Sequence, residues 1–202
     1  MFDSDLDRKT PSRRLFLASA AAAVGGLALW SWKNPASVAA SAESNDKDGE
    51  AQRPVSIVLF DDSGKRLKKV SVPKVVKSTE EWRKQLPPGV FDITRNADTE
   101  IAYTGKYWNL HDKGLYRCIC CDNALFESST KFESGTGWPS FWAPIANENV
   151  REIRDTSIGE VRTAVACKQC DAHLGHVFDD GPPPTHLRYC MNSASLRFVA
   201  KV

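Results

Sequence analysis

Short hydrophobic runs separated by polar turns characterise the chain from residue 55 onward. Residues 55–60 and 66–72 are rich in β-branched side chains and flank the run Asp61-Asp62-Ser63-Gly64, which is typical of a turn. This pattern predicts a β-hairpin. From Ile101 to the C-terminus, short apolar or aromatic runs alternate with Gly, Pro, Asp and Asn, and no long helical stripe interrupts them. We therefore expect a mainly β fold built from antiparallel sheet.

One segment departs from this β pattern. Ser78 and Glu81 have the spacing of a helix capping box, in which each side chain accepts a hydrogen bond from the backbone N–H of the other residue. The pair predicts a short helix that runs through Trp82. The helix is expected to end at Pro87-Pro88-Gly89, because proline cannot continue a helix.

The first 42 residues have the pattern of an export signal. Ser12-Arg13-Arg14-Leu15-Phe16-Leu17 leads into an Ala- and Gly-rich apolar stretch to Trp32 and then into small residues at 36–42. This segment resembles a twin-arginine export signal, which implies passage through the twin-arginine machinery, cleavage after Ala40 or Ala42, and a periplasmic location. The alternative is a retained transmembrane anchor. The expected organisation is a signal, a linker, an added hairpin and a main domain, at residues 1–42, 43–54, 55–77 and 78–202.

Composition and charge narrow the possible partners. The 202 residues are 42% hydrophobic and 26% charged, with 27 Lys and Arg against 25 Asp and Glu, which is ordinary for a globular protein. The small positive excess comes from the first 42 residues, and the charges of the rest balance. Residues 43–202 have no net charge and contain no basic run, which argues against nucleic acid as the partner, because phosphate binding needs concentrated positive charge. The default expectation for the oligomeric state is a monomer.

The spacing of the cysteines points to a metal site. Cys118 and Cys121 form one Cys-x-x-Cys pair, and Cys167 and Cys170 form a second. Two such pairs can place four thiolates around one zinc ion, in a closed site that stabilises the fold and performs no catalysis. The alternatives are two disulfides or a thioredoxin-like redox motif, although the latter requires a βαβ context that this sequence lacks. Cys120, inside the first pair, is interpreted as a bystander.

A sixth thiol, Cys190, lies outside these pairs. In an alternating strand Arg188, Cys190 and Asn192 would share one face, so the guanidinium could stabilise a thiolate and the amide could orient a polar substrate group. The alternative is that Cys190 is a small buried hydrophobic residue. His173 and His176 favour the catalytic interpretation, because imidazoles transfer protons near neutral pH. They could instead be extra metal ligands.

Two loops carry further candidates. Gly135 and Gly137 flank Thr136, so the backbone there can approach a ligand closely, and Trp138 can offer it a flat apolar wall. Asp180 lies in a second loop that continues into three prolines. Its carboxylate could orient a histidine, or it could simply begin a turn.

Together these motifs resemble the B-type methionine sulfoxide reductases. The resemblance rests on the two cysteine pairs and on Gly-Thr-Gly-Trp-Pro-Ser-Phe, His-Leu-Gly-His-Val-Phe and Arg-Tyr-Cys-Met-Asn-Ser-Ala-Ser-Leu-Arg-Phe, and it covers residues 78–202. It implies two antiparallel sheets with short N-terminal helices and one structural zinc ion away from the active site. It also implies reduction of the R epimer of methionine sulfoxide in oxidised proteins or peptides.

Applied to this sequence, the resemblance implies a role for each candidate. Cys190 would be the nucleophile that ends as a sulfenic acid, Trp138 a wall for the substrate methyl group, and His173 and His176 the contacts of the sulfoxide oxygen. Charge and orientation would be set by Arg188, Asp180 and Asn192. Many members carry a resolving cysteine where this chain has Thr136, so we expect a small thiol or a thioredoxin-like protein to reduce Cys190 directly.

Two other classes of protein share parts of this pattern. A zinc-ribbon binding module would use the cysteine pairs but has no need of Cys190 with two histidines. A thiol peroxidase would use a reactive cysteine but has no need of a Trp-walled methyl pocket.

Overall fold

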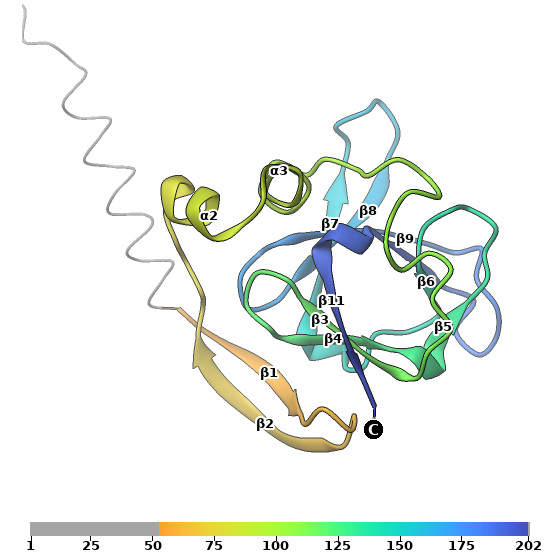
Figure 1. Cartoon of the computed structure of the whole chain (residues 1–202), viewed down its shortest axis with the longest axis horizontal. Helices are drawn as coiled ribbons and strands as arrows, with labels where there is room; N and C mark the ends of the chain where they lie inside the picture. Colours follow the sequence, from red (N-terminus) through yellow and green to blue (C-terminus); the bar gives the residue numbers. More distant parts are fainter. Residues whose placement is uncertain (1–52, 202) are drawn as a thin grey trace, which may run out of the picture. The chain divides into compact units, whose positions relative to one another are not determined.

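The structure is a computed structural model that describes residues 53–201 (Figure 1). The predicted signal at 1–42 and the predicted linker up to residue 52 lie outside the described residues. No helix among residues 53–201 is long and apolar enough to cross a bilayer. The described elements are, in order, β1 (Pro54–Phe60), β2 (Arg66–Pro73), α2 (Thr79–Gln85), α3 (Pro88–Asn96), β3 (Gly114–Cys118), β4 (Ala124–Glu127), η1 (Ser128–Thr130), β5 (Lys131–Phe132), β6 (Ser140–Phe141), η2 (Asn147–Asn149), β7 (Val150–Asp155), β8 (Arg162–Cys167), β9 (His173–Phe178), β10 (Arg188–Met191), η3 (Ser193–Ser195) and β11 (Leu196–Ala200).

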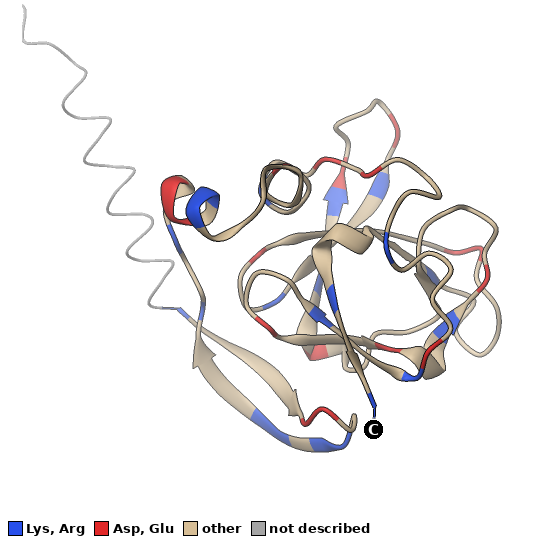
Figure 2. Ribbon diagram, viewed as in Figure 1, with Lys and Arg blue, Asp and Glu red and all other residues tan. Residues whose placement is uncertain are grey.

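β1 and β2 form the predicted hairpin, a two-stranded antiparallel sheet of its own. Its strand β1 packs on the rest of the protein, because Val58 and Phe60 are buried against Ala124. The fully buried Asn149 side chain binds both backbone groups of Val58: it accepts from the N–H at 2.7 Å and donates to the carbonyl at 2.8 Å. β2 is mostly exposed, and Lys and Arg gather along it (Figure 2).

The two helices lie between the hairpin and the sheets along the chain. α2 begins at the predicted capping box, in which Ser78 Oγ accepts from Glu81 N and the Glu81 carboxylate accepts from Ser78 N at 2.8 Å. The prediction that Pro87-Pro88-Gly89 would end the helix is confirmed. The same prolines open a second helix, α3, which the residue pattern did not predict, although the family resemblance implied short N-terminal helices. Pro88 fits there because the first turn of a helix needs no N–H.

Two sheets enclose the core. One is six-stranded, in the order β5-β6-β10-β9-β8-β7, and the other is three-stranded, in the order β11-β3-β4; every pair is antiparallel. Phe126 on β4 stacks on Phe141 on β6 with 4.6 Å between ring centroids, and Tyr116 on β3 meets Phe141 edge-on at 4.9 Å. These aromatic contacts join the two sheets, and the prediction of a mainly β fold with antiparallel sheets is confirmed.

Candidate active site and metal centre

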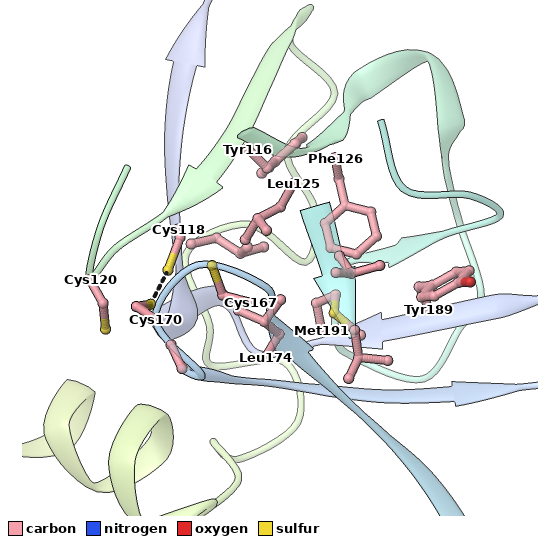
Figure 3. Close-up of a cluster of buried hydrophobic side chains, with 14 of the residues drawn as sticks. Tyr116, Cys118, Cys120, Leu125, Phe126, Cys167, Cys170, Leu174, Tyr189 and Met191 are labelled. Carbon is pink, nitrogen blue, oxygen red and sulfur yellow. Dashed lines mark hydrogen bonds between the residues drawn. The ribbon is translucent and has the colours of Figure 1, made fainter. Parts of the chain in front are cut away.

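The four paired cysteines converge at one point. Figure 3 shows three of them, Cys118, Cys167 and Cys170, which are buried. Both pairs lie in turns of the same design, which follow β3 and β8. In each turn the N–H of the residue after the second cysteine, Asp122 or Asp171, donates to the carbonyl of the first cysteine, and that aspartate has a positive φ. The repeated turn folds each local pair toward one centre. Each turn thus forms one half of the site, and the two halves meet because the three-stranded sheet that contains β3 packs against the six-stranded sheet that contains β8.

The geometry of the four sulfurs fits zinc. All four lie within 4.8 Å of one another, with 3.7 Å between the Cys118 and Cys170 sulfurs and 3.5 Å between those of Cys121 and Cys167. A tetrahedral site with zinc–sulfur bonds of about 2.3 Å places its sulfurs about 3.8 Å apart. A disulfide needs about 2.05 Å, so the two-disulfide alternative does not describe this arrangement.

Neither histidine belongs to this cluster. Among the described residues, the cysteines alone form a group that could hold a metal ion. The interpretation of His173 and His176 as extra ligands is therefore not supported. Asn123 approaches the cluster instead, with its Nδ2 donating to Cys167 Sγ at 3.6 Å, as a residue outside the ligand set that orients a thiolate.

Cys190 lies in a separate small cavity on the six-stranded sheet. The cavity has a volume of about 140 Å³ and brings together four predicted site residues from different elements. It is lined by Thr99, Trp138, Arg162, Gly175, His176, Phe178, Cys190 and Asn192. Cys190 on β10 pairs directly with His176 on β9, so the two side chains share one face of the sheet. The volume suits a small group such as the end of a methionine side chain.

A β-bulge explains how both histidines reach this face. Residues three apart in a regular strand point to opposite faces. Here Ala166 on β8 pairs with His173 and Ala164 pairs with His176, so Leu174 is left over as a bulge and the two rings meet with 5.3 Å between centroids. Gly175 is required beside the bulge, because a Cβ there would lie 2.1 Å from the Cys190 carbonyl oxygen.

The two histidines have different surroundings. His173 is 8% exposed and lines a neighbouring cavity, not the cavity of Cys190. Its Nε2 is buried without a hydrogen-bond partner in the described residues. Burial, helped by the nearby His176, lowers the pKa of His173 to about 4, so this ring is neutral at physiological pH. His176 is therefore the better placed of the two to exchange a proton at the Cys190 cavity.

The carboxylate that faces His176 belongs to Asp155, a residue that the sequence analysis did not single out. Asp155 Oδ2 lies 2.7 Å from His176 Nε2 and accepts from the Arg162 guanidinium at 2.7 Å. Hydrogen bonds from Ser157, and then from His176, hold the pKa of Asp155 far below its usual range. Asp180, the expected orienting carboxylate, binds the Arg188 guanidinium at 2.8 and 2.9 Å instead.

Three polar side chains act on the Cys190 thiol, those of Thr136, Ser140 and Arg188. Thr136 Oγ1 is 3.9 Å from Cys190 Sγ, within sulfur hydrogen-bond range. Burial raises the pKa of Cys190, while the charge of Arg188 and the hydroxyls of Thr136 and Ser140 act in the opposite direction. Cys190 is consequently a thiol at neutral pH. Once its proton has left, the charge of Arg188 and the two hydroxyls stabilise the thiolate.

A second unpredicted residue, Glu100, connects two walls of the cavity. Its backbone N–H donates to Asn192 Oδ1 at 3.1 Å, and its backbone carbonyl accepts from Trp138 Nε1 at 3.1 Å. Its carboxylate accepts from the N–H groups of Ser193 and Ala194 at 2.6 and 3.0 Å. One residue thus fixes the amide and the indole that the sequence analysis assigned to substrate binding. A lone Glu in a loop gives no sequence signal of this role.

Comparisons with known proteins agree with this arrangement. Residues 86–200 match the SelR domain. The chain is 54% identical over 127 residues to a protein of Herminiimonas arsenicoxydans named peptide methionine sulfoxide reductase MsrB, covering 63% of this chain and 93% of that one. It is 58% identical over 125 residues to a protein of that name from Pseudomonas putida strain W619, covering 62% and 94%. On this evidence the chain belongs to the SelR-domain family of peptide methionine sulfoxide reductases.

Proposed function

We propose that this protein reduces the R epimer of methionine sulfoxide in oxidised proteins or peptides, with Cys190 as the nucleophile. The observation that carries the proposal is the cavity of about 140 Å³ in which Cys190 meets Trp138, His176 and Asn192. The indole supplies an apolar wall for the methyl group. The imidazole and the amide supply the polar groups that a sulfoxide oxygen requires.

The chemistry runs in two balanced steps. The Cys190 thiolate attacks, the oxygen passes from the sulfoxide sulfur to the cysteine sulfur, and one proton is taken up on that oxygen. The substrate sulfur is reduced by two electrons to the thioether, and Cys190 is oxidised by two electrons to the sulfenic acid. Two thiol groups of a reductant then reduce the sulfenic acid to the Cys190 thiol. The two reductant thiols are oxidised to a disulfide, and the oxygen is released as one water molecule.

His176 is the residue placed to deliver the proton. Its Nε2 faces the Asp155 carboxylate, which fixes the ring, and its side chain lines the Cys190 cavity. Asp155 is itself anchored by Arg162 and by Ser157 Oγ, which donates to its Oδ1 at 2.7 Å. The carboxylate therefore holds the His176 ring in a fixed orientation, as a positioning residue rather than a proton donor.

We assign zinc to the cluster of Cys118, Cys121, Cys167 and Cys170. The sulfur distances and the burial of the cluster support a closed tetrahedral site. The ion, when bound, supplies cross-linking of the β3 and β8 turns and no chemistry at Cys190.

The electron donor is a small thiol or a thioredoxin-like protein that reacts with Cys190 directly. Thr136 stands where a resolving cysteine would lie, and the buried Cys120 packs in the core together with the metal-site cysteines.

Export by the twin-arginine machinery to the periplasm is also proposed, on the resemblance of residues 1–42 alone. Cell fractionation, with mass spectrometry of the mature N-terminus, tests it: an N-terminus at residue 41 or 43 is expected.

The function is tested with the purified full chain, dithiothreitol and a peptide that contains one methionine sulfoxide, followed by chiral chromatography. We expect loss of the R epimer only. Cys190→Ser should abolish the reaction, and Cys120→Ser is the matched control that should retain it. A Cys190→Ser protein of unchanged activity would overturn the proposal and favour the binding-module alternative. Consumption of peroxide in preference to the sulfoxide would favour the peroxidase alternative.

A further inference from the structure

A second cavity adjoins the Cys190 cavity on the same face of the six-stranded sheet. It has a volume of about 480 Å³, and its lining shares Arg162 and His176 with the smaller one. The remaining walls come from the end of α3, from β7 and the turn after it, from β8, and from Asp171 and His173. The two cavities therefore adjoin in one depression.

The strand register gives this depression a direction. Cys190 on β10 pairs with His176 on β9, His176 pairs with Ala164 on β8, and Ala164 pairs with Ile153 on β7. These four side chains form one row across the sheet. Neighbouring strands lie about 4.8 Å apart, so the row leads about 10 Å from Cys190 to Ala164 and about 14 Å to Ile153. An extended peptide covers that span with about three or four residues, at about 3.3 Å each.

The larger cavity is positively charged. Arg95, Arg154 and Arg162 line it, against Asp155 and Asp171. Both carboxylates are already paired: Asp155 with Arg162, and Asp171 with Arg151 and Lys74. Arg154 is exposed and makes no hydrogen bond or ion pair among the described residues. The available charge at the rim is therefore basic.

The cavity also contains polar atoms without partners. His173 and Arg162 both line it, and each has one buried nitrogen without a hydrogen bond, His173 Nε2 and Arg162 Nε. The His173 side chain is more than nine-tenths buried. Both nitrogens are enclosed by the protein, so they add polar character to the cavity wall but are not exposed to a ligand in this structure.

We propose that this cavity is a subsite for the polypeptide that flanks the methionine sulfoxide, and that it favours an acidic group three or four residues away from it. The inference rests on the proposed function, because the occupant is the substrate of Cys190. The carboxylate can come from an Asp or Glu side chain or from a chain end. The floor of Ala164 and Ala166 leaves room for the peptide, and the basic rim selects its charge.

The test uses acetylated and amidated peptides with one central methionine sulfoxide and the full chain as enzyme. One peptide pair carries two Glu or two Lys at the third and fourth positions after the sulfoxide, and a second pair carries them before it. We expect kcat/KM for the Glu peptide to exceed that for the Lys peptide by about fivefold on one of the two sides, the upper range for one exposed ion pair. A neutral peptide with a free C-terminal carboxylate at the same distance separates a chain end from a side chain.

Arg154→Glu should abolish or reverse this preference. Arg66→Glu, a matched charge reversal on the exposed strand β2, should leave it unchanged. Equal rates for Glu and Lys peptides on both sides, or a preference that Arg154→Glu does not alter, would overturn the subsite and leave the reductase function intact. Failure of the wild-type protein to reduce any of the peptides would overturn the proposed function itself.

Discussion

Glu100 offers the sharpest test of how the Cys190 cavity is held together. Its carboxylate accepts two backbone N–H groups at the start of η3, and its backbone holds the Asn192 amide and the Trp138 indole. Glu100→Gln keeps the size and shape of the side chain. It removes the charge and places an amide NH₂ group against one of the two N–H donors.

The magnitude follows from these contacts. A hydrogen bond to a charged group contributes about 1.5–3 kcal/mol. Because Glu100 is partly exposed, the lower end applies, and Glu100→Gln should lower the free energy of unfolding by about 2 kcal/mol. Since η3 follows Asn192 directly, kcat/KM for a methionine sulfoxide peptide should also fall by about tenfold, equivalent to about 1.4 kcal/mol of transition-state stabilisation.

Urea unfolding and steady-state kinetics on the same preparations measure both effects. Glu160→Gln is the matched control, because Glu160 is exposed and makes no hydrogen bond or ion pair within residues 53–201, so its loss should cost less than about 1 kcal/mol. The reasoning is refuted if Glu100→Gln unfolds at the same urea concentration as the wild type and retains full kcat/KM. A loss of stability with normal kinetics would refute the link from Glu100 to the cavity.

Three further predictions concern the metal, the thiol and the core. Cys118→Ser should leave the protein with less than stoichiometric zinc by elemental analysis and a lower Tm, whereas equal zinc content would contradict the assigned ligands. Because burial raises the pKa of Cys190, kcat/KM should rise with pH through the range where the thiol ionises. Arg188→Ala removes a positive charge that lowers this pKa, so the rise in kcat/KM should move to higher pH in this variant. An unshifted pH profile would contradict this reasoning. Tyr116→Phe should increase the free energy of unfolding by about 1 kcal/mol in urea, because the Tyr116 hydroxyl is buried without a partner; a decrease would show that the hydroxyl is satisfied.

Local sequence patterns determined much of this protein. The hairpin, the capping box at Ser78 and the mainly β character depend on contacts between residues close in the chain, so periodicity and turn residues were sufficient to predict them. The same holds for each Cys-x-x-Cys turn, whose closing hydrogen bond joins two residues four apart, Asp122 N to the Cys118 carbonyl or Asp171 N to the Cys167 carbonyl. The residue pattern did not predict α3, because Pro88 was interpreted only as the end of one helix, although its missing N–H also suits the start of another.

The tertiary structure decided which of the candidates meet. Strand register is a long-range property, and the bulge at Leu174 that turns His173 to the face of His176 appears only when β9 pairs with β8. The partner of His176 is Asp155, from another strand, and Asp180 is taken by Arg188. Glu100 reaches Ser193 across 93 positions of sequence. A sequence shows which residues could do chemistry, but hydrogen bonds between distant segments exist only after the sheets have closed around the core, and these bonds assign the roles.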